Sequence, residues 1–94
     1  MNEKISDLRK NILNIDARIV RLLCKRMNLV RRIAKIKKNE GISVVDTLRE
    51  QQVLDHVNTL PHDPIQTGQL LELYEHIIRI SRETQSDLLN ETTE

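Results

Sequence analysis

Two basic side chains, Arg26 and Lys37, lie on the apolar side of a long helix predicted for the first part of the chain. They are eleven positions apart, so they point within roughly 20° of each other and lie about 16 Å apart along the helix. A buried cation is costly unless a negative group pairs with it. Because the planar guanidinium of Arg matches a carboxylate, the pair favours a small anion that carries carboxylates.

Polar residues also interrupt the apolar patterns of two further predicted helices. Ser81 and Gln85 occupy positions of the last helix where Leu or Ile is expected, and Asp46, Arg49 and Glu50 lie together in "DTLRE". If the three helices pack together, these groups form one polar pocket. It would contain at least two cations, two neutral hydrogen-bonding groups and one carboxylate.

The two cations each have a simpler interpretation. Arg26 could pair with Glu72 or Glu75 in the core, or extend its head group to solvent. Lys37 lies near a helix C-terminus, where the helix dipole favours a positive charge.

The other polar groups have simpler interpretations too. Ser81 could bond back to its own helix, Gln85 could lie at a fraying helix end, and Glu50 could be a capping residue. Three separate elements placing polar groups inward nevertheless favour the common pocket.

The sequence offers no arrangement for covalent or metal-dependent chemistry. His56, His62 and His76 lack a metal-ligand spacing, and the single Cys24 excludes an internal disulfide and a zinc site built from cysteines. Cys24 is expected to be a buried, inert thiol. We expect no metal and no cofactor, so an enzyme built on this pocket would act by positioning and electrostatics.

Arg26 and Lys37 are positioned by the first helix, which is predicted over residues 4–39. This segment contains no Gly or Pro and ends before Gly41. At about 1.5 Å per residue it would span roughly 50 Å. One apolar stripe follows its length at steps of three and four, consisting of Ile5, Leu8, Ile12, Ile15, Ile19, Leu22, Leu29, Ile33 and Ile36. The shorter helices cannot cover this stripe alone, which predicts an intertwined homodimer with a shared core.

Two shorter helices are predicted after it, over residues 47–59 and 65–89, giving one all-α domain that spans residues 1–94. Thr47 and Glu50 fit a capping box at the start of the second helix, and two prolines separate it from the third. No stretch is apolar enough to be a signal peptide or to span a membrane, so we expect a cytoplasmic protein without a membrane partner.

Charge is divided unequally along the chain. Residues 1–38 contain 12 basic and 3 acidic residues, and the remainder contains 3 basic and 11 acidic residues. The basic part therefore either binds an anion or pairs with the acidic part. The basic run "RRIAKIKK" has no interleaved aromatic residue and no DNA-binding helix pattern beside it, so no nucleic-acid partner is expected.

The ordered set of polar residues resembles that of the small all-helical chorismate mutases, the AroQ class, over nearly the whole chain. The matching segments are "LRKNILNIDARIVRLLCKR", "IAKIKK", "DTLRE" and "IIRISRETQ". The motif positions within them are Arg9, Asp16, Arg26, Lys37, Asp46, Arg49, Glu50, Ser81 and Gln85.

This resemblance implies the cofactor-free Claisen rearrangement of chorismate to prephenate by a homodimer with two sites, each bounded by both chains. It implies four catalytic groups, namely Arg26, Lys37, Glu50 and Gln85. Further substrate-binding positions implied by the resemblance are Arg9, Ile33, Asp46, Arg49, Ile78 and Ser81.

Helix geometry gives Arg9 a special position. It precedes Arg26 by 17 residues, which is about 25 Å along a straight helix and roughly 100° around it. Arg9 therefore cannot share a pocket with Arg26 of its own chain, whereas an antiparallel partner helix could donate it.

Two alternatives stay open. Isochorismate pyruvate-lyases share the fold, but those similar to this sequence lack the Asp46 and Glu50 pair of "DTLRE", which favours the mutase. The other alternative is a non-enzymatic helical dimerisation module.

Overall fold

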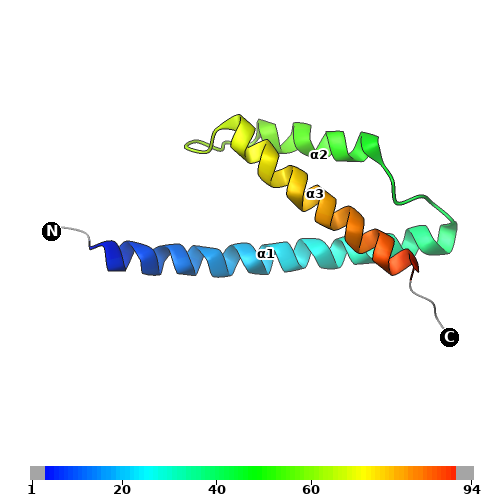
Figure 1. Cartoon of the computed structure of the whole chain (residues 1–94), viewed down its shortest axis with the longest axis horizontal. Coiled ribbons are helices and arrows are strands. Elements are labelled where there is room, and N and C mark those ends of the chain that lie inside the picture. Colours follow the sequence, from blue (N-terminus) through cyan, green and yellow to red (C-terminus); the bar gives the residue numbers. More distant parts are fainter. Residues whose placement is uncertain (1–3, 91–94) are drawn as a thin grey trace.

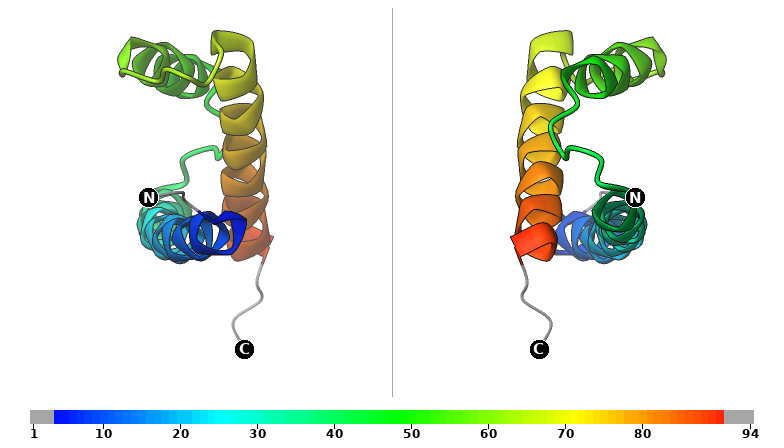
Figure 2. Two further views of the ribbon diagram at one scale, coloured as in Figure 1. Left: turned by 90° about the vertical axis from the view of Figure 1, so that its left-hand side faces the viewer. Right: turned by 90° about the vertical axis from the view of Figure 1, so that its right-hand side faces the viewer.

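The computed structural model describes residues 4–90, which form three α-helices and no strand: α1 (Ile5–Glu40), α2 (Thr47–Thr59) and α3 (Thr67–Asn90). α3 packs on both other helices, crossing the C-terminal half of α1 and running beside α2 (Figure 1). Seen along α1, the chain is an open hook in which α3 rises from α1 and carries α2 at its far end (Figure 2). The all-α prediction is confirmed.

The C-terminus of α1 is closed by Gly41, which adopts the left-handed conformation with φ 70°. The Ile42 N–H donates to the carbonyl of Lys37 at 2.8 Å, and the Gly41 N–H donates to that of Lys38 at 3.4 Å. These two bonds form a Schellman motif, which satisfies carbonyls that the last helical turn leaves free. The cap therefore fixes the backbone at Lys37, one of the predicted site residues.

The start of α2 differs in detail from the predicted capping box. Asp46 is the N-cap residue, and its carboxylate accepts a hydrogen bond from the backbone N–H of Arg49 at 2.9 Å. Thr47 is already helical, and the Glu50 side chain bonds elsewhere. Asp46 occupies this position because its short carboxylate reaches the third helical N–H from a non-helical backbone, with φ −140° and ψ 80°.

α3 begins at Thr67, two residues later than the sequence pattern indicated. The Ile65 N–H donates to the carbonyl of His62 at 2.6 Å, so these residues form a turn. The first helical bond of α3 runs from Leu70 N–H to Gln66 O, and the Gln69 side chain accepts from the Gln66 N–H at 3.1 Å. The helix therefore starts where these residues satisfy its free backbone groups.

The single chain has little core of its own. Its buried apolar residues are Val30, Ala34, Val57, Leu70, Ile78 and Leu88. The dimensions are 61 × 31 × 14 Å and the radius of gyration is 17.3 Å, whereas a compact domain of this length has about 12 Å. No described helix is long and apolar enough to cross a membrane.

The apolar stripe of α1 is largely uncovered. Ile5, Ile12 and Leu22 are each more than half exposed, and the N-terminal end of α1 extends beyond the other two helices (Figure 1). Cys24, which was expected to be buried, is exposed in the single chain.

Candidate active site

The predicted polar residues of all three helices meet at one cavity of about 140 Å³. The cavity is lined by Arg26, Val30, Ile33, Lys37, Arg49, Glu50, Val53, Ile78, Ser81 and Gln85. Helices α1 and α3 supply the donors along their crossing, and the first half of α2 closes the remaining side.

Arg26 and Ser81 are bonded directly across the crossing of α1 and α3. The Arg26 Nη1 donates to the Ser81 Oγ at 2.6 Å, and that hydroxyl donates to the carbonyl of Ile77 at 2.8 Å. Ser81 is only 7% exposed. The predicted alternative of a bond from Ser81 to its own helix is thus present together with the bond to Arg26.

Arg26 keeps its positive charge available for a ligand. Within residues 4–90 no carboxylate lies at ion-pair distance from Arg26, so the alternative pairing with Glu72 or Glu75 is not formed. A half-buried guanidinium whose bonded neighbour is a neutral hydroxyl attracts an anion, because its charge is not yet compensated.

Lys37 and Gln85 form a second link between α1 and α3. The Lys37 Nζ donates to the Gln85 Oε1 at 3.1 Å. With its oxygen directed at the ammonium group, the Gln85 amide keeps its Nε2 hydrogens as donors. An ammonium and an amide therefore lie together on the cavity wall, where both can donate to one acceptor.

Glu50 is bound by Arg82, a residue that was not among the predicted site residues. The Arg82 Nε donates to the Glu50 Oε2 at 3.0 Å, and its Nη2 donates to the Oε1 at 2.8 Å. This hydrogen bond, together with the negative charge of Glu50, raises the pKa of the Arg82 guanidinium above its ordinary value. Arg82 directly follows Ser81 and faces the first turn of α2, but it breaks no apolar pattern, so the sequence contains no signal for its role.

The apolar walls include both predicted residues and two that were missed. Ile33 and Ile78 line the cavity as expected, together with Val30 and Val53. Val30 lies one helical turn after Arg26, and periodicity alone could have identified it.

Two predicted residues do not line the cavity of this chain. Asp46 is the N-cap residue of α2 and is not among the residues that line the cavity. Arg9 lies on the exposed N-terminal half of α1, away from the cavity. Its contribution to a partner's site stays a prediction.

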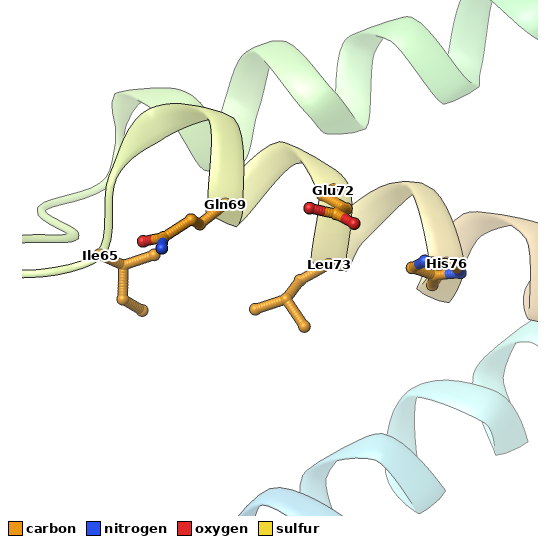
Figure 3. A pocket seen from close by; sticks show the side chains of 5 residues that line it. All are labelled: Ile65, Gln69, Glu72, Leu73 and His76. Atoms are coloured by element: carbon orange, nitrogen blue, oxygen red, sulfur yellow. The ribbon is translucent and has the colours of Figure 1, made fainter.

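Two larger hollows lie along α3. One, of about 400 Å³, is lined by Ile65, Gln69, Glu72, Leu73 and His76 on a single side (Figure 3). The other, of about 500 Å³, is lined mainly by apolar residues of α1 and α3 and has Arg26 at its border. The polar residues of the first hollow all come from one side, and the second hollow is mainly apolar. The smaller cavity brings polar side chains of all three helices together and is therefore the better site for chemistry.

The chorismate mutase type II family model matches residues 8–86. The chain belongs to this family. The chorismate mutase of Methanocaldococcus jannaschii is 29% identical over 93 residues, covering 98% of this chain and 94% of that protein. The bifunctional chorismate mutase/prephenate dehydratase of Buchnera aphidicola is 40% identical over 85 residues, covering 87% of this chain but only 22% of that protein.

A solved structure is similar over the same range. The crystal structure of chorismate mutase from Helicobacter pylori in complex with prephenate superposes with a TM-score of 0.85 at 27% identity, covering 95% of this chain and 97% of that one. The family resemblance drawn from the sequence, the fold it implied and its assignment to an isomerase, chorismate mutase, are thereby confirmed.

Proposed function

We propose that the cavity of Arg26, Lys37, Glu50, Ser81 and Gln85 binds chorismate and rearranges it to prephenate. The observation that supports this most strongly is the convergence of these side chains from three helices on one cavity. In the rearrangement the ether C–O bond breaks as a C–C bond forms, within one molecule and without an external reagent. The protein then has to fix the reactive conformer and stabilise the charge that develops on the ether oxygen.

Lys37 and Gln85 are the proposed donors to the ether oxygen. Their mutual hydrogen bond places a positive ammonium group beside a neutral amide donor. Both groups are in position before the reaction, so their dipoles need no reorganisation as negative charge builds up. This interaction strengthens in the transition state and therefore raises kcat.

The remaining groups hold the substrate. Arg26 binds one carboxylate and the partner's Arg9 binds the other, while Ser81 and Arg49 support the ring carboxylate. Glu50, with the backbone near Asp46, receives the ring hydroxyl. Ile33 and Ile78 form the apolar walls that keep the reacting arm over the ring.

The active form is proposed to be a cytoplasmic homodimer. Its support is the exposed apolar stripe of α1 and the division of charge into a basic first helix and an acidic remainder. A second copy would cover the stripe and bring opposite charges together.

The activity is tested by incubating the purified protein with chorismate and measuring the loss of its absorbance and the appearance of prephenate. Arg26→Ala should bind chorismate weakly and show almost no turnover. Release of pyruvate from isochorismate, without prephenate from chorismate, would instead identify a lyase.

Donation of Arg9 between chains is tested by mixing two inactive variants, Arg9→Ala and Arg26→Ala. If sites are shared, half of the dimers after subunit exchange contain one intact site, which restores about a quarter of the wild-type rate. No recovery, with exchange verified by mass, would place both arginines in one chain's site or Arg9 outside the site.

A further inference from the structure

The cross-helix ion pair of Glu50 and Arg82 has a geometry that ordinary surface pairs lack. Two separate N–H groups of Arg82 bind the two oxygens of one carboxylate at 3.0 and 2.8 Å. The pair joins α2 to α3 across 32 positions of sequence, and the Glu50 side chain is 25% exposed. A two-point bond fixes the plane of the carboxylate as well as its distance.

We propose that Arg82 is a positioning residue, whose guanidinium holds the Glu50 carboxylate in the orientation that receives the ring hydroxyl of the substrate. This inference rests on the proposed function, in which Glu50 binds that hydroxyl. Arg82 itself does not line the cavity, so it acts through Glu50 and not by contact with the substrate.

The arrangement leaves Glu50 able to bind a ligand. Each carboxylate oxygen has two lone-pair positions, and Arg82 occupies one on each oxygen. The remaining positions can accept a hydrogen bond from a hydroxyl group on the cavity side, since Glu50 also lines the cavity.

The ion pair of Glu50 and Arg82 also explains how α3 can set the position of a side chain on α2. Ser81 and Gln85 on α3 face the cavity, while Arg82, about 100° further around the helix than Ser81, reaches Glu50. One face of α3 thus presents donors to the cavity, and Arg82 on the adjacent face of α3 fixes the acceptor Glu50.

α3 also provides a matched control in Arg79 and Glu83. This pair lies within one helix, joined by a single contact of 3.4 Å, and both side chains are more than half exposed. Such an exposed pair contributes little, and neither residue lines the cavity.

The test compares Arg82→Ala, Arg82→Lys, Glu50→Ala, the double variant Arg82→Ala with Glu50→Ala, and Arg79→Ala. The ring hydroxyl does not react, so losing its acceptor weakens ground state and transition state alike. Arg82→Ala should raise KM for chorismate about three- to tenfold with kcat little changed, because a hydrogen bond to a charged group is loosened. Arg82→Lys should lie in between, and Arg79→Ala should match the wild type.

Two readouts separate positioning from a general structural role. The double variant should be no worse than Glu50→Ala alone, because Arg82 has nothing left to hold. For a chorismate analogue that lacks the ring hydroxyl, Arg82→Ala and the wild type should have equal KM values.

Different failures identify different errors. An active wild type with unchanged KM in both Arg82 variants overturns this inference and leaves the proposed function standing. A further loss in the double variant, or an equal loss with the analogue, shows that Arg82 acts independently of Glu50. A wild type without mutase activity refutes the proposed function itself.

Discussion

At the scale of single residues, the bond between Lys37 and Gln85 combines the only two donors proposed to face the ether oxygen. Lys37→Ala removes the charged donor and should lower kcat about 10²- to 10³-fold, in the range measured for losing one preorganised donor. The free energy of unfolding should change far less than the activation free energy of the reaction, because the Lys37 head group lies at the cavity wall. Steady-state kinetics beside urea unfolding measures both, with Lys35→Ala, an exposed lysine on another face of α1, as control. Near wild-type turnover in Lys37→Ala would remove the central electrostatic claim.

Gln85 should make the reaction insensitive to acid, because an amide donates without being protonated. In Gln85→Glu the new carboxyl donates only when protonated, and its ordinary pKa is about 4.3. The adjacent Lys37 ammonium favours the ionised form and lowers that pKa further. The turnover of the variant should therefore fall as pH rises above this range, while the wild type stays nearly constant to pH values near neutrality. Parallel pH profiles for the two proteins would show that Gln85 does not donate.

Some site residues can be recognised from the sequence and others cannot, for a physical reason. Arg26, Ser81 and Gln85 could be identified because each breaks an apolar helical pattern. Arg82 breaks no pattern, since a charged residue on an exposed helical face is ordinary. Its role depends on which face of α3 meets α2, and that angle comes from packing.

At the scale of elements, α2 depends on its first turn. Asp46→Ala removes the side-chain acceptor of the Arg49 N–H and should lower the free energy of unfolding by about 1 kcal/mol. KM should rise as well, because Arg49 and Glu50 follow in the same turn. Urea unfolding and chorismate kinetics measure the two effects. Asp46→Asn retains a capping oxygen and should recover most of the stability; an equal loss in both variants would contradict the capping role.

The helix boundaries show how far local sequence signals predict where a helix begins and ends. Gly41 could be assigned as the end of α1 because the left-handed conformation favours glycine. The cap of α2 was assigned to the wrong residue, because Asp46 and Thr47 are both good capping residues and adjacent. The backbone conformation of Asp46 decides between them, and it depends on the path of the preceding loop.

At the scale of the whole molecule, the exposed stripe of α1 predicts how assembly and activity are coupled. Ile12 is 56% exposed in the single chain, and Ile12→Asp would place a charge in the proposed dimer core, where desolvation is costly. We expect Ile12→Asp to be mostly monomeric at micromolar concentration and at least roughly tenfold less active, since a site without the partner's Arg9 is incomplete. Analytical ultracentrifugation and kinetics give the two results. Asn14→Asp introduces the same side chain on the opposite face of α1 and should remain dimeric and active; a dimeric, active Ile12→Asp would contradict the shared core.

The sequence predicted that this stripe lacks cover within its own chain, because helix length follows directly from the absence of Gly and Pro between residues 4 and 39. It could not predict that the other helices lean toward the C-terminal half of α1. Their crossing point is set by which side chains interlock at Val30, Ala34 and Ile78.

The small core has a kinetic consequence for how the protein reaches its working form. With six buried apolar residues among those described, a lone chain gains little by collapsing, so the proposed dimer would acquire most of its stability only on encounter. Refolding from denaturant should then follow second-order kinetics, with a half-time that shortens as the protein concentration increases. The midpoint of equilibrium unfolding in denaturant should rise with protein concentration. The long helix that makes the two chains share their sites would thus also make the folded fraction of the protein depend on its total concentration.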